Sequence, residues 1–101
     1  MDTIYWDIRF SRRVVKQIRH LPQSMQETVK FLVKDLQLGG PMARTWPNFG
    51  KLQGRNDCYH CHLRKGRPTY VAVWQVMDQG ARIIEVKYVG THEGADYRRV
   101  C

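Results

Sequence analysis

The sequence predicts an α+β domain of two layers, in which a pair of helices packs on one face of an antiparallel sheet. Apolar residues follow helical spacing in the first half of the chain. In the second half they alternate or run continuously, as in strands. The 101 residues, 43% hydrophobic and 26% charged, fit one domain spanning residues 1–101 and exclude a disordered chain. The expected element order is β-α-α-β-β-β.

The chain should begin with a strand and a short helix. Apolar and polar residues alternate from Ile4 to Phe10, which is typical of a strand with one buried face, and Phe10 should lie on that face. Ser11 stands at a position that favours an N-cap. The helix behind it should end near His20, before the break at Pro22.

A second helix should follow at once. Ser24 and Glu27 have the spacing of a capping box, in which each side chain satisfies a backbone N–H of the other. A Gly-Gly-Pro stretch at 39–41 should end this helix. Its apolar face comprises Met25, Val29, Leu32, Val33 and Leu36. The tight connection between the two helices predicts a helical hairpin.

Residues 39–57 have no regular period. A loop of this length is unusual in so small a domain, and such loops are often functional. Trp46 and Phe49 lie within it, and the simplest interpretation is that they pin the loop onto the core.

Three strands are expected in the second half. Residues 58–64 alternate, residues 69–77 form a nearly continuous apolar run, and residues 83–88 alternate again. The apolar run is typical of a central strand that is covered on both faces. Short turns join the three segments and predict an antiparallel meander. Residues 93–101 form a polar tail without a predicted element.

The charge points to an acidic partner. Seventeen Lys and Arg against nine Asp and Glu give a formal net charge of +8 and a pI near 9.8. Nucleic acid, an acidic membrane surface or an acidic protein would suit such a surface. No stretch is apolar enough to span a membrane, and the first residues do not resemble a signal peptide, so the cytoplasm is the expected compartment.

Residues 58–62 contain two cysteines and two histidines, which are zinc ligand types. A regular strand would place Cys61 on the face opposite the histidines, and no second Cys/His pair exists to complete a site. Zinc is therefore a weak alternative, and we expect no metal and no cofactor. The odd count of three cysteines argues against a disulfide framework.

Polar side chains of residues 58–64 should form a row on the sheet face that the helices leave open. The first and third strands of a meander run parallel, so their carboxyl ends meet at one edge. This topology predicts one corner that comprises His62, Arg64, Lys87, His92 and Tyr97. The alternative is that the histidines are ordinary strand and turn residues without a chemical role.

The groups at this corner match the needs of RNA cleavage by a 2′-hydroxyl. Histidine can serve as acid or base near neutral pH. Arginine binds phosphate oxygens through two N–H groups, and an aromatic ring can stack on a base. The 2′-hydroxyl is the nucleophile, so no metal is needed. The same basic surface could instead bind an acidic partner without catalysis.

Three stretches carry a family resemblance. Residues 57–63 (Asp-Cys-Tyr-His-Cys-His-Leu), 71–74 (Val-Ala-Val-Trp) and 88–92 (Tyr-Val-Gly-Thr-His) resemble the RelE/ParE superfamily of toxins from type II toxin–antitoxin systems. The likeness extends along nearly the whole chain and implies a RelE-like fold. The histidines and the Gly-Thr-His ending are similar to the YafQ-type branch. Residues 61–74 and 88–93 resemble RelE-like proteins described as cytotoxic translational repressors.

This resemblance implies a ribosome-dependent mRNA endonuclease that cleaves without a metal and inhibits translation. His62 and His92 match the acid/base histidines, while Arg64 and Tyr97 complete the catalytic set. The YafQ-type branch has a carboxylate soon after its first histidine, and residues 63–66 here contain none. Because of this difference the chain is more similar to the RelE-type pattern, in which Arg and Lys side chains contribute more to catalysis. Candidate RNA or phosphate contacts are Lys87, Arg67, Lys65, His60, Trp46, Arg12, Arg13 and Lys16.

The resemblance also implies partners. These are mRNA on the ribosome, with its ribosomal RNA, and a cognate acidic antitoxin that should carry a DNA-binding domain. Two other functions stay open. One is a ParE-like inhibitor of DNA gyrase, although that branch generally lacks the histidines. The other is a basic module that binds RNA or protein without catalysis.

Overall fold

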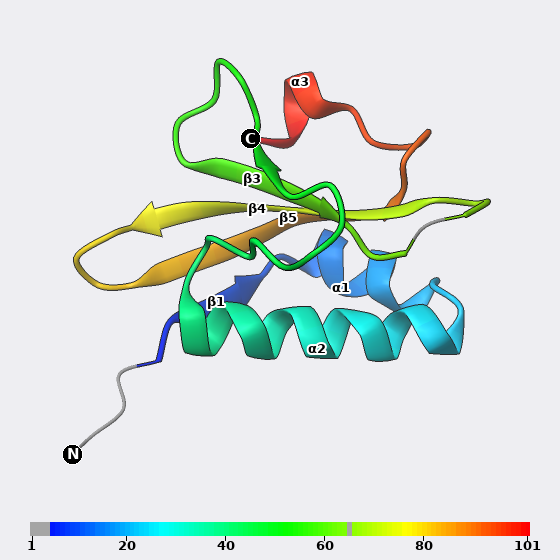
Figure 1. The fold of residues 1–101 in the computed structure, drawn as a ribbon, viewed down its shortest axis with the longest axis horizontal. Coiled ribbons are helices and arrows are strands. Elements are labelled where there is room, and N and C mark those ends of the chain that lie inside the picture. The colour runs from blue at the N-terminus through cyan, green and yellow to red at the C-terminus, as the bar shows by residue number, and fades with distance from the viewer. Residues whose placement is uncertain (1–4, 65) are drawn as a thin grey trace.

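The computed structural model describes residues 5–64 and 66–101. An α+β architecture is confirmed, with helices α1 and α2 on one side of a five-stranded sheet (Figure 1). The elements are β1 (Asp7–Phe10), α1 (Arg12–Arg19), α2 (Gln23–Gly39), β2 (Gly50–Lys51), β3 (Cys58–His62), β4 (Tyr70–Asp78), β5 (Ile83–Thr91) and α3 (Tyr97–Val100). Within the described ranges, no helix is long and apolar enough to cross a membrane.

The strand order is β1-β5-β4-β3-β2. The predicted meander of β3, β4 and β5 is confirmed, since both pairs are antiparallel. β1 joins the edge of the meander parallel to β5, and it pairs only with the first half of that strand, Ile83 to Val86. Two short elements, β2 and α3, were not predicted because two and four residues are too few to show a period.

The helix starts show one correct prediction and one error. Ser11 caps α1 as predicted, because its hydroxyl oxygen accepts a hydrogen bond from the N–H of Val14 at 3.2 Å. The capping box of Ser24 and Glu27 is wrong. The N-cap of α2 is Pro22, and no side chain caps this helix end. Proline fixes φ near the helical value, so the helix begins directly after it and Ser24 falls inside the first turn.

The core lies between the two helices and the sheet. Trp74 on β4 is fully buried, and its indole N–H donates to the carbonyl of Pro41 at 3.1 Å. The predicted face of α2 is confirmed, with Val33 partly buried and the other four members buried. Phe49 stacks on Trp74 with ring centroids 6.2 Å apart, and Trp46 packs against the core. These contacts confirm that the two aromatic residues pin the long loop.

The first strand departs from its prediction at the end. Trp6 and Ile8 pack against the core as expected, but Phe10 is 38% exposed. The reason is that β1 is a short edge strand that ends where α1 begins. Ile4, the predicted start of this strand, lies outside the described residues.

Gly40 ends α2 in a conformation that requires glycine. Its φ is +85° and its ψ is −165°, a region that other residues avoid. A Cβ atom built there would lie 2.9 Å from the indole Nε1 of Trp6. The predicted Gly-Gly-Pro stop is therefore confirmed, and the packing of Trp6 depends on it.

The C-terminal tail covers the sheet face that the helices leave open, with α3 on the side opposite α2 (Figure 1). A disulfide joins Cys58 on β3 to Cys101, and the Arg55 guanidinium donates to the carbonyl of Arg98. The expectation that the cysteines form no disulfide is wrong for this pair. Cys61 is a buried free cysteine, and its burial raises the pKa of the thiol to about 12.

The disulfide gives a first testable prediction. Unfolded, unreduced protein should expose one alkylatable thiol, that of Cys61, and reduced protein should expose three, as counted by mass spectrometry. The bridge spans 43 residues. Cys101→Ser should therefore lower the unfolding free energy by about 2–4 kcal/mol. Reductant should not destabilise that variant further, which is the control. Three reactive thiols without reductant would contradict the prediction.

Candidate active site

Four aromatic rings gather on the open face of the sheet and are called the histidine cluster: His60, His62, His92 and Tyr97. The ring centroids of His62 and His92 are 5.7 Å apart. Tyr97 lies 6.1 Å from His92 and 5.8 Å from His60 by the same measure. The structure thus brings together three residues of the predicted corner and adds His60.

The sheet register places the two outer members. His62 on β3 pairs with Val71 on β4, and Val71 pairs with Gly90 on β5, so this row ends two residues before His92. The backbone N–H of His92 donates to the carbonyl of Thr69 at 2.8 Å, which fixes the chain just after β5. Antiparallel register therefore converts a separation of thirty residues into neighbouring side chains.

Tyr97 comes from the tail. It is the first residue of α3, whose N-cap Asp96 accepts a hydrogen bond from the N–H of Arg98 at 3.1 Å. The disulfide to β3 holds the end of the same short helix. Cap and disulfide together position the ring between His60 and His92.

The environment favours the uncharged forms of these groups. Burial lowers the pKa of His60, and the nearby imidazoles of His62 and His92 lower it further. Burial, and then His92, lower the pKa of His62. Burial raises the pKa of Tyr97. At neutral pH His60 and His62 are therefore neutral imidazoles, which accept protons, and Tyr97 is a phenol, which can donate one. The Nδ1 atom of His60 is buried without a hydrogen-bond partner among the described residues.

These shifts predict a loss of stability in acid. The pKa values of His60 and His62 in the folded protein lie below the ordinary 6.5. Between those lowered values and pH 6.5, the unfolded chain therefore binds more protons than the folded one. Stability from these groups is fully present above pH 6.5 and is lost as the pH falls through the lowered values. Denaturant titrations should show a smaller unfolding free energy at about pH 5 than at about pH 7. The double variant His60→Gln/His62→Gln should lose less over the same interval, and an equal loss in both proteins would contradict this origin.

Arg64 lies next to the cluster in sequence but contacts the turn between β3 and β4. Its guanidinium carbon is 5.2 Å from the ring centroid of Tyr70, and its Nε donates to the carbonyl of Pro68 at 3.4 Å. Arg67 is exposed in the same turn. Lys65, another predicted RNA contact, lies outside the described residues.

Two other candidates have structural partners of their own. Lys87 forms an ion pair with Glu85 at 3.1 Å, so the structure places it in a salt bridge rather than among the rings of the cluster. The indole N–H of Trp46 donates to the Asp35 carboxylate at 2.8 Å. Trp46 therefore joins the long loop to α2 and is not part of the cluster.

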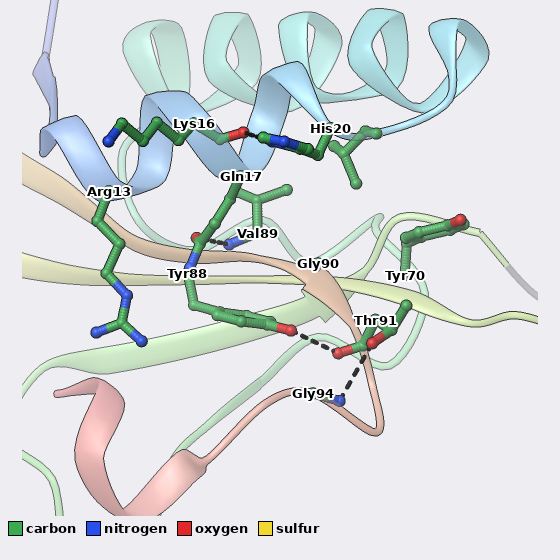
Figure 2. A pocket seen from close by; sticks show the side chains of 11 residues that line it. Arg13, Lys16, Gln17, His20, Tyr70, Tyr88, Val89, Gly90, Thr91 and Gly94 are labelled. Carbon is green, nitrogen blue, oxygen red and sulfur yellow. Dashed lines mark hydrogen bonds between the residues drawn. The ribbon is translucent and has the colours of Figure 1, made fainter.

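A cavity of about 590 Å³ lies between α1 and the end of β5 (Figure 2). Arg13, Lys16 and His20 line it from α1, and Tyr70 and Tyr88 line it from the sheet. Arg13 and Lys16 are predicted RNA or phosphate contacts, but the cavity and its tyrosines were not predicted. A signal was available, because positions 13, 16 and 20 share one face of a helix.

The described residues, 5–64 and 66–101, contain no group of three or more His, Cys, Asp or Glu side chains that could hold a metal ion. Of the zinc-type residues at 58–62, Cys58 is in the disulfide and Cys61 lies in the core beneath the sheet. The rings of the cluster are groups that can donate and accept protons in acid/base chemistry.

The chain is similar to several toxins of known structure or sequence. A double mutant of the E. coli toxin RelE in complex with an antitoxin RelBc peptide is 31% identical, with 89% of this chain and 86% of that chain covered and a TM-score of 0.67. The same toxin mutant in the free state has a TM-score of 0.72 at 28% identity, covering 93% and 90%. A curated protein of Methanocaldococcus jannaschii, provisionally named toxin RelE1, is 27% identical over 90 residues, which are 89% of this chain and 93% of that protein. No family model matches the chain.

An archaeal RelE–RelB complex from Pyrococcus horikoshii OT3 shares the fold, with a TM-score of 0.72 at 19% identity and coverage of 90% and 99%. Fold and comparisons together define a small basic toxin of the α+β type. The chain belongs to the RelE family of toxins from toxin–antitoxin systems.

Proposed function

We propose that this protein is a ribosome-dependent mRNA endonuclease that inhibits translation through cleavage at the histidine cluster. The observation that carries the proposal is the 5.7 Å approach of His62 and His92, beside Tyr97, on a RelE-family fold with a net charge of +8. Two imidazoles at this separation suit a reaction in which one group takes a proton and another gives one.

The proposed reaction begins at the ribose. His62, whose lowered pKa keeps the ring neutral, removes the proton from the 2′-hydroxyl. The 2′-oxygen bonds to phosphorus, the bond from phosphorus to the 5′-oxygen breaks, and His92 donates a proton to that leaving oxygen. The products are a 2′,3′-cyclic phosphate and a 5′-hydroxyl. The nucleophile belongs to the substrate, so the reaction requires no metal.

The remaining candidates would hold the RNA. Arg64 would bind phosphate oxygens, since a guanidinium presents two N–H groups at once. Tyr97 would stack on a base or donate a proton, and burial keeps its phenol protonated by raising the pKa. His60 lies behind these groups against the Tyr97 ring and would keep that ring in place.

The proposal includes an acidic antitoxin with a DNA-binding domain as a protein partner. Related structures are described as complexes of RelE toxins with RelB antitoxins. The net charge of +8 on this chain would favour an acidic partner by long-range attraction.

Primer extension on a defined mRNA tests this function. Purified protein should produce new 3′ ends inside codons when ribosomes translate the message and should leave free mRNA intact. Intact mRNA together with inhibited DNA supercoiling would favour a gyrase inhibitor instead. Binding to translating ribosomes without cleavage of the mRNA would instead favour a module that binds RNA or protein without catalysis.

A further inference from the structure

The cavity between α1 and β5 is separate from the rings of the histidine cluster but shares one segment with them. Thr91 and Gly94 line the cavity, and His92 lies between them in the same turn. The turn is fixed, because the Gly94 N–H donates to the Thr91 hydroxyl at 3.1 Å and the Tyr88 hydroxyl donates to the Thr91 carbonyl at 2.8 Å (Figure 2). The turn at residues 91–94 therefore borders the cavity and carries His92 of the cluster.

We propose that this cavity binds a nucleotide of the RNA next to the cleaved bond, with its phosphate on Arg13 and Lys16 and its base against the tyrosine-bearing wall. The inference rests on the proposed RNA cleavage and extends it to a second binding site. It assigns a role to α1, which contributes nothing to the cluster.

The charge of the lining selects an anion. Arg13 and Lys16 on α1 border the cavity together with His20, the C-cap residue of that helix (Figure 2). None of the lining residues that the structure describes is Asp or Glu, although Arg13 also lines the adjoining cavity that Asp96 borders. Arginine and lysine both bind phosphate, arginine through its fork of N–H groups.

The opposite wall of the cavity is aromatic and apolar, and it is suited to contact a nucleobase rather than a charged group. Tyr88 is anchored by its hydroxyl, and Leu21 and Val89 add apolar surface. Tyr70 already carries the Arg64 guanidinium near its ring, which connects this wall to a phosphate candidate of the cleavage site. Unpaired bases stack on aromatic rings of this kind.

The Gln17 amide and the size of the cavity further limit the kinds of ligand that the cavity can bind. The side-chain oxygen of Gln17 accepts a hydrogen bond from the Val89 N–H at 3.0 Å, on the edge of β5 that faces away from β4 and that β1 does not reach. This bond orients the amide and leaves its NH₂ group as a donor for a base. A volume of about 590 Å³ is within the usual range for small-ligand sites and fits a nucleotide rather than a duplex.

An acidic peptide segment is the competing ligand. It would satisfy the cations, but it would not use the tyrosines or the oriented amide. The combination of cations on one wall and aromatic rings on the other therefore favours RNA.

Fluorescence anisotropy with a labelled single-stranded oligoribonucleotide tests the inference. Ribosomes are absent from this assay, so the proposed function predicts that the probe binds without being cleaved. Arg13→Ala/Lys16→Ala should raise the Kd about 10-fold and reduce the slope of log Kd against log salt by about 1. The matched control is Lys30→Ala/Lys34→Ala, which removes two exposed charges from α2 and should leave both values unchanged.

A second measurement separates this inference from the proposed function. On translating ribosomes, Arg13→Ala/Lys16→Ala should require a higher protein concentration than the wild type for half-maximal cleavage. Wild-type affinity and slope in this variant would overturn the inference while wild-type cleavage stands. Weakened binding of a hexaglutamate peptide with unchanged RNA binding would also overturn it, in favour of an acidic protein ligand. If the wild type itself cleaves nothing, the proposed function fails, and the anisotropy result still decides whether the cavity binds RNA.

Discussion

Replacement of either His62 or His92 with alanine is expected to lower the rate of mRNA cleavage by about 100-fold or more. A positioned acid or base contributes roughly 10²–10⁴ to such reactions. The two rings lie 5.7 Å apart and would act on opposite sides of one phosphate. Growth inhibition by protein expressed without an antitoxin should fall in parallel. Single-turnover cleavage on ribosomes programmed with a defined mRNA provides the rate.

The two histidines should act as a unit. The double variant should therefore be little slower than either single variant, because removal of one partner already disables the paired proton transfers. Lys30→Ala, an exposed substitution on α2, is the control and should cleave at the wild-type rate. Full toxicity in both histidine variants would contradict the assignment, provided that circular dichroism shows them folded.

Trp74→Ala is expected to produce the largest loss of stability. The Trp74 side chain is fully buried on the central strand of the sheet, and Phe49 stacks on it with ring centroids 6.2 Å apart. Truncation of a buried tryptophan costs about 3–5 kcal/mol. It also removes the donor for the Pro41 carbonyl, which links the sheet to the chain after α2.

Denaturant titration measures this loss. Phe31→Ala is the matched control, since Phe31 is also a large aromatic residue but is 65% exposed on α2. That change should alter the unfolding free energy by no more than about 0.5 kcal/mol. A loss below about 1 kcal/mol for Trp74→Ala would show that Trp74 does not hold the core together.

The sequence was enough to predict the meander, and the meander was enough to bring His62 near His92. Alternation fixes which strand residues share a face, and short turns force antiparallel neighbours. The apolar run at 69–77 predicted a strand buried on both faces, which is correct for residues 71–74, whereas Met77 at its end is 48% exposed. Local signals of this kind do not depend on distant parts of the chain.

The features that sequence reasoning missed depend on distant contacts. The tail has no periodic pattern, so neither α3 nor the pairing of Cys58 with Cys101 could be predicted across 43 residues. The disulfide holds the tail against the sheet, and the position of Tyr97 between His60 and His92 depends on it. The cavity beside Tyr88 arises because β1 stops at Phe10 and leaves the second half of β5 to α1, a register that the sequence does not specify.

The most direct test of the central claim is cleavage of an mRNA with a single altered ribose. Cut sites are first mapped on translating ribosomes, and the message is then synthesised with a 2′-deoxynucleotide immediately before one cut. Attack by the 2′-hydroxyl predicts that this cut disappears, that cuts elsewhere persist, and that those products carry 5′-hydroxyl ends. Continued cleavage at the deoxy position, or 5′-phosphate ends at the other cuts, would contradict acid/base catalysis by the histidine cluster.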